Sequence, residues 1–190
     1  MRFMRTLTRF TFLFLSLGCL LAVSACGYQF VGRASPLPPE VRRIAVPTFE
    51  NNTFEPLLDE RLTDAVKKAF IDYPRLEVVN SASEADAVLK GRIIAFLLVP
   101  LSFNTLNEAA EYRVRIQTDI TLQDSRNQKI LWQQKKMETI TEYFVIQDPL
   151  DSTRVDIART RDAEDRAIAE AAKVLGQDLV GQIREGFPSH

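Results

Sequence analysis

Cysteine and histidine are almost missing from this chain, and their scarcity excludes most side-chain chemistry. The 190 residues include two cysteines and one histidine, and that histidine is His190 at the end of the sequence. A histidine there cannot serve a catalytic triad or a metal site inside a packed pocket. The sequence also has no Gly-x-Ser-x-Gly motif and no glycine-rich phosphate loop. We therefore expect a protein that is not an enzyme and that uses no metal and no cofactor, although a glycosidase working with carboxylates alone stays open.

The N-terminal segment has the composition of a secretory signal. Residues 1–9 carry Arg2, Arg5 and Arg9 and no acid, and residues 10–23 carry no charge at all. A basic start, an apolar run and small residues after it are typical of a signal peptide. The run is shorter than the roughly 20 residues that a membrane-spanning helix needs. We expect residues 1–25 to be removed; the alternative is an anchor helix that stays in place.

The second cysteine follows this segment directly. Val23-Ser24-Ala25-Cys26 resembles a bacterial lipobox, in which the thiol receives diacylglycerol and cleavage makes the cysteine the acylated N-terminus. Two or three acyl chains anchor a protein stably, because one chain alone binds a membrane only marginally. Gly27 in place of an aspartate favours the outer membrane. The alternative is ordinary signal cleavage beside an unmodified Cys26, and in either case Cys19 is lost, so no disulfide is expected.

The charge balance argues against a nucleic-acid partner. The chain has 24 Lys and Arg against 25 Asp and Glu, and loss of the three N-terminal arginines would leave 21 against 25, a formal charge of −4. Nucleic-acid-binding domains usually carry a basic excess. Any anionic ligand must therefore be bound by a local cluster of cations.

Hydrophobic periodicity divides the rest of the chain into a tether, one domain and a short tail. Residues 26–40 are rich in proline and small residues and read as an extended tether, residues 41–186 form the domain, and residues 187–190 are a tail. Strands are expected at residues 41–49, 76–79, 87–101, 112–122 and 130–144, and helices at residues 56–71 and 161–184. This order, β-α-β-β-β-β-α, predicts an α+β two-layer sandwich with two helices on one face of a mostly antiparallel sheet of four to five strands.

One face of that sheet combines cations with apolar side chains. In the strand over residues 87–101, regular alternation places Leu97 and Val99 toward the core, and Phe96 and Leu98 on the other face. Cations beside exposed apolar residues could bind an amphiphile that carries phosphates and acyl chains. The candidate binding residues are Arg92, Arg113, Arg115, Lys135 and Lys136. The alternative is a solvated face with cross-strand pairs such as Arg92 with Asp119.

Several stretches resemble one known family. The lipobox followed by Gly27-Tyr-Gln-Phe30, the stretch IAVPTFENNTFEP over residues 44–56, LTDA over residues 62–65 and DAVLKG over residues 86–91 resemble the LPS-assembly lipoproteins, the LptE-like family. The resemblance implies an outer-membrane lipoprotein on the periplasmic side. It also implies a plug inside the LPS-transport β-barrel, which is LptD-like, a role in folding that barrel, and binding of lipopolysaccharide. No family ligand residue is matched one to one, so the five cations remain a prediction from the pattern.

Lipoprotein activators of peptidoglycan synthases are the main rival. They too have a lipidated cysteine, a flexible tether and a small domain that opens with a similar strand, but their tethers are typically long. The roughly 15 residues from Cys26 to Glu40 span at most about 50 Å at about 3.3–3.6 Å per residue. A short tether favours a partner at the membrane itself.

Overall fold

The structure, a computed structural model, describes residues 37–151 and 153–185. The expected signal peptide, Cys26, residues 26–36 of the tether and the tail over residues 187–190 therefore lie outside the described residues. Within the described ranges, no helix is both long enough and apolar enough to cross a membrane.

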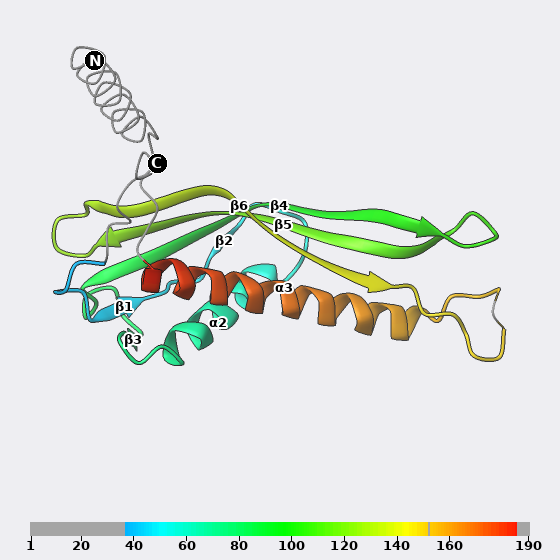
Figure 1. Cartoon of the computed structure of the whole chain (residues 1–190), viewed down its shortest axis with the longest axis horizontal. Helices are drawn as coiled ribbons and strands as arrows, with labels where there is room; N and C mark the ends of the chain where they lie inside the picture. The colour runs from blue at the N-terminus through cyan, green and yellow to red at the C-terminus, as the bar shows by residue number, and fades with distance from the viewer. Residues whose placement is uncertain (1–36, 152, 186–190) are drawn as a thin grey trace, which may run out of the picture. The chain divides into compact units, whose positions relative to one another are not determined.

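A mixed sheet of six strands forms one layer (Figure 1). The strands are β1 (Arg43–Ala45), β2 (Glu50–Asn51), β3 (Glu77–Val79), β4 (Ala87–Phe103), β5 (Ala109–Asp124) and β6 (Ile130–Phe144). The strand order is β3-β1-β4-β5-β6, with β2 also paired to β4. The long strands β4, β5 and β6 are antiparallel, whereas β1, β2 and β3 pair in parallel. The predicted fold class is confirmed, with the two-residue strand β2 as an element that periodicity did not reveal.

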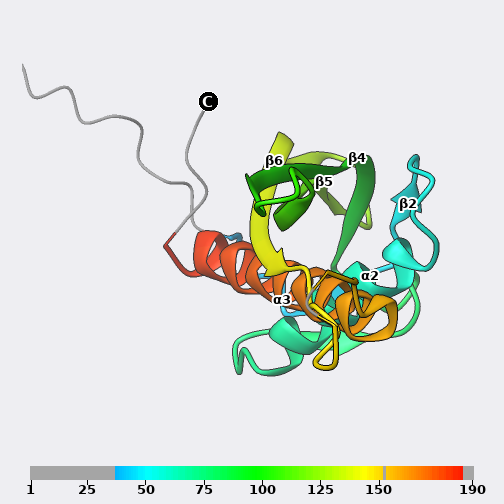
Figure 2. The same ribbon diagram turned by 90° about the vertical axis from the view of Figure 1, so that its right-hand side faces the viewer.

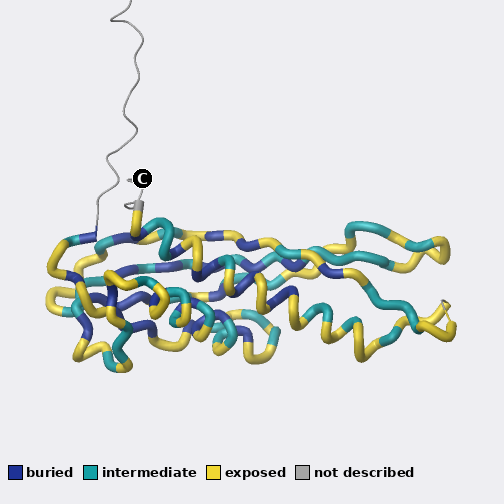
Figure 3. The backbone as a smooth tube through the Cα atoms, turned by 60° about the horizontal axis from the view of Figure 1, so that its bottom comes forward, coloured by how far each residue is buried: buried dark blue, intermediate teal, exposed yellow. Residues whose placement is uncertain are grey.

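Two helices form the other layer. Helix α2 (Leu58–Ile71) and helix α3 (Ile157–Glu185) lie on the same side of the sheet, as Figure 2 shows. Apolar residues at helical spacing on each helix are buried: Leu58, Leu62, Val66 and Phe70 on α2, and Ile168, Ala171, Ala172, Leu175, Leu179 and Ile183 on α3. Helix α3 begins at Ile157, earlier than the predicted start near Arg161. The buried segments gather where the helices underlie the sheet (Figure 3).

Two glycines lie where backbone segments approach closely. A Cβ on Gly176 of α3 would lie 2.9 Å from the Cβ of Ala69 and 3.0 Å from the carbonyl oxygen of Ala65, both on α2. A Cβ on Gly91 of β4 would lie 2.5 Å from three ring atoms of Phe49. Glycine at these positions therefore lets α2 pack against α3 and lets the Phe49 ring lie directly on β4.

A bulge in β4 changes which side chains face the core. Ile93 pairs with Thr118 while Ala95 pairs with Gln117, so Ile94 is an extra residue on β4. Beyond it the cross-strand pairs are Phe96 with Ile116, Leu97 with Arg115, Leu98 with Val114, and Val99 with Arg113. Because Ile116 and Val114 are buried, Phe96 and Leu98 lie on the core side. The prediction for this half of β4 is therefore wrong, and Leu97 and Val99 face away from the helices. The reason is that one extra residue in a bulge reverses the inward and outward alternation of all side chains after it.

Asp86 joins β1 to the start of β4. Its carboxylate accepts hydrogen bonds from the backbone N–H groups of Arg42 and Arg43 at 3.1 and 3.0 Å. The guanidinium groups of Arg43 and Arg126 lie 3.4 and 3.3 Å away. The backbone N–H of Arg43 contributes most to lowering the pKa of this carboxyl group from 3.8 to about 2, against an opposing effect of burial. The charged form of Asp86 is therefore part of the folded structure.

Candidate functional site

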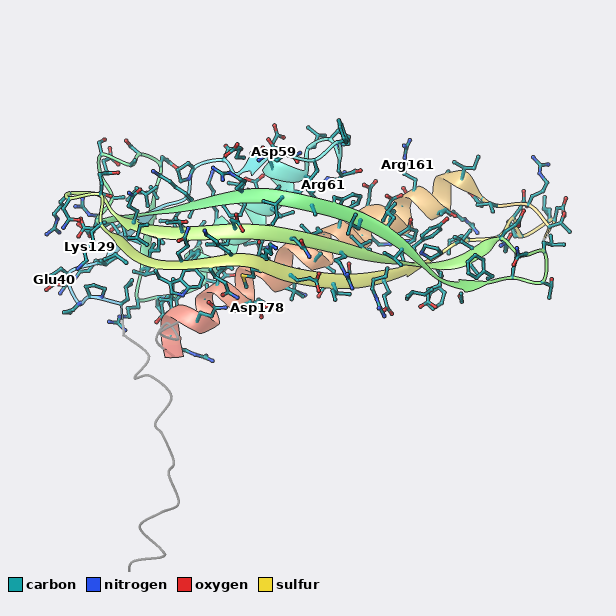
Figure 4. The ribbon with its side chains drawn as sticks, turned by 90° about the horizontal axis from the view of Figure 1, so that it is seen from above. Glu40, Asp59, Arg61, Lys129, Arg161 and Asp178 are labelled. Carbon is teal, nitrogen blue, oxygen red and sulfur yellow. The ribbon has the colours of Figure 1, made fainter. Side chains whose placement is uncertain are left out.

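The surface of β4, β5 and β6 that points away from the helices carries all five predicted cations, and we call it the outer face. Figure 4 looks onto this face, with the helices behind the strands. Strand β4 contributes Arg92, β5 contributes Arg113 and Arg115, and β6 contributes Lys135 and Lys136. The strand registers place these residues in three rows across the three strands, and the row of Gln117 separates Arg92, Lys135 and Lys136 from Arg115 and Arg113. Residues far apart in the sequence are thus brought together on one surface.

One row across the sheet contains three of the five cations. Arg92 on β4 is the cross-strand partner of Asp119 on β5, as the alternative interpretation supposed. The ion pair of Arg92, however, is with Glu50 on β2, at 2.8 Å from Nε to Oε2. The hydrogen bond that Arg92 donates to the Glu50 carboxylate is the largest cause of the raised pKa of Arg92, followed by the charge of Glu50. On the other side of Asp119 lie Lys135 and Lys136 of β6, so acids and bases alternate along this row.

The two arginines of β5 are paired with glutamates of β6. The Arg113 guanidinium donates to the Glu142 carboxylate at 2.7 Å, and the Arg115 Nε atom lies 3.2 Å from Glu138. All four side chains are partly exposed, between 33% and 42% of their surface. Ion pairs this exposed contribute little to stability, about 0–1 kcal/mol each. They also leave these arginines already neutralised, which the sequence pattern did not predict.

Lys135 and Lys136 differ from the arginines. They form a bulge opposite Asp119, because Thr118 pairs with Met137 while Ile120 pairs with Gln134. Lys136 adopts a left-handed backbone conformation, with φ of 53°, and its backbone N–H donates to the Asp119 carboxylate at 2.9 Å. Both lysines are exposed, and neither ammonium group has an ion pair with another described residue. Bulges of this kind often redirect side chains next to binding sites.

Apolar side chains lie between the charged rows. Leu97 and Val99 of β4 are 46% and 39% exposed, and Ile140 and Phe144 of β6 are 44% and 63% exposed. Ile140 lies opposite Arg115 on the outer face. Ile140 and Phe144 are not among the predicted site residues, although their alternation with Glu138 and Glu142 along β6 was the available signal. On the outer face, Leu97, Val99, Ile140 and Phe144 thus all lie on the same side of the cationic bulge.

The described residues contain no group of three or more His, Cys, Asp or Glu side chains that could hold a metal ion. The fold is that of a small α+β domain, and its outer face carries cations and exposed apolar residues. The family model for lipopolysaccharide assembly, LptE, matches residues 41–183, and the chain belongs to this family. The family acts as a non-catalytic factor in the assembly of lipopolysaccharide.

The structure gives a physical reason for the sequence stretches that carried the family resemblance, because three of them meet at Phe49. The Phe49 ring, 2% exposed, covers Gly91. Its backbone N–H donates to the Thr63 hydroxyl at 2.9 Å, and that hydroxyl donates to the carbonyl of Asp59 at 2.6 Å. The stretches over residues 44–56, 62–65 and 86–91 therefore form one contact that joins α2 to β4.

Several solved structures are similar to this chain. The hypothetical protein CT253 from Chlamydia trachomatis is 11% identical, with 77% of this chain and 97% of that chain covered and a TM-score of 0.50. A putative lipoprotein from Caulobacter crescentus is 20% identical over 75% of this chain and 94% of that one, with a TM-score of 0.42. Lipoprotein GNA1162 from Neisseria meningitidis is 15% identical over 76% and 99%, with a TM-score of 0.43. At 11% identity the likeness to CT253 shows the fold alone. No curated protein matches the chain in sequence.

Proposed function

We propose that this protein is an outer-membrane lipoprotein that plugs and helps to assemble the LPS-transport β-barrel, and that it binds lipopolysaccharide on its outer face. The observation that carries the proposal is the outer face of a domain from the lipopolysaccharide-assembly family, where the exposed Lys135–Lys136 bulge adjoins exposed apolar residues. Lipopolysaccharide is an amphiphile with phosphates and acyl chains, and such a surface suits both parts.

Within this proposal the five cations have different roles. Lys135 and Lys136 contact phosphate first, because their ammonium groups are not engaged by carboxylates of the described residues. Arg92, Arg113 and Arg115 must exchange a glutamate for a phosphate, so each contributes less to the affinity for the ligand. Leu97 and Ile140, together with Phe144, offer hydrocarbon to acyl chains farther along the sheet. The ligand is thus oriented with its phosphates over the bulge.

The anchor in this proposal is Cys26, which lies outside the described residues. Lipidation there would hold the protein on the periplasmic side of the outer membrane. The ten residues from Gly27 to Pro36 would then separate the lipid from Leu37, where the described domain begins. At about 3.3–3.6 Å per residue they reach roughly 35 Å, so the domain stays at the membrane, where a barrel is accessible.

Charge reversal tests the ligand site, with a matched control elsewhere in the chain. The double variant Lys135→Glu with Lys136→Glu should weaken binding of purified lipopolysaccharide about tenfold or more, because a hydrogen bond to a charged group contributes about 1.5 kcal/mol or more. Lys67→Glu with Lys68→Glu changes an adjacent lysine pair on α2, away from the outer face, and should change affinity less than about twofold. Equal losses in both pairs would mean that net charge, not this site, governs binding.

Purification of the tagged, lipidated protein from outer membranes in mild detergent tests the partner. One large β-barrel recovered at near one-to-one ratio supports the plug. Recovery of a peptidoglycan synthase instead would overturn it in favour of the activator role. Cys26→Ala should release the protein from the outer membrane, and fractionation of cells would detect this; an unchanged distribution would contradict lipid anchoring.

A further inference from the structure

Phe54 is a fully exposed aromatic residue on the loop that joins β2 to α2. It is 107% exposed, whereas Phe49, just before β2, is 2% exposed in the core. In Figure 2 the segment around β2 stands beside β4, on the side away from β5 and β6. A single exposed apolar residue is common on protein surfaces. The conformation of the loop and the charges around it therefore decide whether Phe54 has a role.

Side-chain hydrogen bonds hold this loop in one conformation. The Asn51 side-chain amide donates to the Glu55 carbonyl at 2.8 Å, and its oxygen accepts from the Thr53 N–H at 3.0 Å and from the Thr53 hydroxyl at 2.7 Å. The Glu55 N–H in turn donates to the Thr53 hydroxyl at 3.3 Å. The residues on both sides of Phe54 are thus fixed. Little conformational freedom remains to be lost on binding, and such pre-organisation raises affinity.

The loop ends in a residue with an unusual backbone conformation. Leu57, which directly precedes α2, is left-handed with φ of 59° and is itself 57% exposed. Bulky residues rarely adopt this conformation, and residues held in it are found preferentially at functional sites. Leu57 therefore adds a second large apolar side chain to the exposed part of this loop.

A shallow hollow of about 380 Å³ adjoins Phe54. It lies between the loop and β4, where Thr53 and Phe54 line one side and Ile94 and Phe96 line the other. Strand β2 pairs with β4 as far as Ile93, and the chain beyond β2 then leads to α2. We call Phe54, Leu57 and this hollow the loop surface. It combines a protruding ring with a recess beside it, a shape that suits a complementary protein surface.

Two carboxylates beside the loop surface have no countercharge. Neither Glu55 of the loop nor Glu164 of α3 forms an ion pair with another described residue. Burial, followed by the charges of Glu55 and Asp165, raises the pKa of Glu164, and the opposing charges of Arg161 and Arg61 are smaller effects. Asp165 is already paired with Arg61 at 2.7 Å. Glu55 and Glu164 are therefore close enough to repel each other, and their charge is not compensated.

This charge distinguishes among possible occupants of the loop surface. Glu55 and Glu164 repel an anionic membrane surface, and they repel the phosphates of lipopolysaccharide in the same way. A second copy bound through the same surface would place these carboxylates against themselves. A protein with an apolar pocket and basic side chains at its rim suits the surface better. The pocket receives Phe54, the basic side chains supply the countercharge, and an arginine among them can also lie against the ring.

We propose that the loop surface is a docking site for a partner protein that has an apolar pocket rimmed by basic side chains. The ring of Phe54 enters the pocket, and Glu55 and Glu164 pair with the basic side chains. None of these three residues belongs to the predicted lipopolysaccharide site. The proposal thus goes beyond the proposed function, and it requires neither lipopolysaccharide binding nor a barrel as the partner.

Photo-cross-linking of the full lipidated protein in intact cells tests this proposal. The photoreactive residue p-benzoylphenylalanine is placed at position 54, where it replaces one aromatic residue by another, or at position 71 as a control. Ile71 is also exposed, at 66%, but lies at the opposite end of α2. We expect position 54 to form an adduct with one protein, at least about tenfold more than position 71. Mass spectrometry of the adduct should locate it at an apolar site flanked by lysine or arginine.

Removal of the two charges tests their part in docking. Glu55→Gln with Glu164→Gln should lower the yield of the adduct at position 54 about tenfold, because the basic side chains of the partner lose their countercharge. Glu77→Gln with Glu84→Gln changes two exposed acids on and after β3 and should leave the yield unchanged. Urea unfolding checks the fold, and the first pair should be no less stable than the parent, because it removes a repulsion.

Other adducts would overturn the proposal. An adduct of position 54 with lipopolysaccharide or phospholipid means that the loop surface contacts lipid. An adduct with a second copy means that the surface mediates self-association. Equal yields at positions 54 and 71, or no adduct at either, mean that nothing docks there. A protein adduct whose yield is unchanged by Glu55→Gln with Glu164→Gln also contradicts the proposal.

The outcomes separate this docking site from the proposed function. A barrel that co-purifies with the protein but gives no adduct at position 54 overturns the docking site and leaves the plug intact. A charge-dependent adduct with a different protein, in cells where no barrel co-purifies, supports the docking site and overturns the plug. A charge-dependent adduct with the barrel itself supports both.

Discussion

The contact between Phe49 and Gly91 yields the sharpest test of the folded structure. Replacement of Gly91 by alanine would place a Cβ 2.5 Å from the Cγ, Cδ2 and Cε2 atoms of Phe49. Non-bonded carbon atoms prefer about 3.5–4.0 Å, so the ring must move by about 1 Å or more. The ring has little freedom to do so, because Phe49 is 2% exposed and its backbone N–H is held by Thr63.

The magnitude follows from two opposing effects. Overpacking of a filled core costs about 1–3 kcal/mol, and complete loss of a buried phenylalanine from the core, the upper bound, costs about 3–5 kcal/mol. Alanine itself is favoured over glycine in a strand by about 0.5–1 kcal/mol. We therefore expect Gly91→Ala to lower the free energy of unfolding by about 2 kcal/mol, which is a large part of the 5–15 kcal/mol typical of a domain.

Urea unfolding followed by circular dichroism measures this change, and two other glycines provide controls. Gly181→Ala has nothing within 4 Å of the new Cβ and should stabilise α3 by up to about 1 kcal/mol. In Gly176→Ala the same gain in helix propensity should be offset by crowding against α2, because the new Cβ would lie 2.9 Å from the Cβ of Ala69. A change of less than about 0.5 kcal/mol in the free energy of unfolding of Gly91→Ala would contradict the close contact with Phe49. So would a Gly91→Ala variant that unfolds no more readily than Gly181→Ala.

Three further predictions follow from burial and charge. Leu62→Asp should unfold the domain, because Leu62 is 0% exposed in the core and an unpaired buried charge costs several kcal/mol; a cooperative thermal transition near that of the parent would contradict this. Since the pKa of Asp86 is lowered to about 2, its contribution of about 1–2 kcal/mol is present above pH 4 and is lost as the pH falls through 2. Asp86→Asn should therefore make the free energy of unfolding depend less on pH below pH 4. An unchanged dependence on pH would refute the role of Arg42 and Arg43. Burial, followed by the charge of Glu164, raises the pKa of Tyr143 to about 12, so stability should fall as the pH rises from 10 to 12, and Tyr143→Phe should remove that fall in an alkaline unfolding series.

The helices and strands could be predicted because each has a strong local pattern. Buried residues recur at helical spacing on α2, from Leu58 to Phe70, and the buried Val114, Ile116, Ile120 and Leu122 keep the alternation of a strand on β5. Strand β2 escaped prediction because two residues carry no period, and it exists only by pairing with β4. The earlier start of α3 depends on Asp156 and Thr160, which bond to Ile146 across the loop. Such contacts join residues that are far apart in the sequence, so no local sequence pattern predicts them.

For the candidate site, the sequence predicted which cations lie on the outer face, but not which of them form ion pairs. Arg113 and Arg115 alternate on β5, and the same alternation placed them on the face away from the helices, where they lie. Their pairing with Glu142 and Glu138 depends on the register between β5 and β6. The exposed bulge at Lys135 and Lys136 depends on that register too, because the left-handed conformation of Lys136 accompanies the shift opposite Asp119.

By itself the sequence determined the fold class, the buried faces of both helices and the stretches shared with the lipopolysaccharide-assembly family. These properties arise from periods of 3.6 and 2 residues and from short motifs, which are local in the chain. Only the tertiary structure decided that Leu97 and Val99, not Phe96 and Leu98, face outward, and which cations have partners. The physical reason is that the second half of β4 is apolar on both faces, so its orientation is fixed by hydrogen bonding across the bulge at Ile94 and not by hydrophobicity.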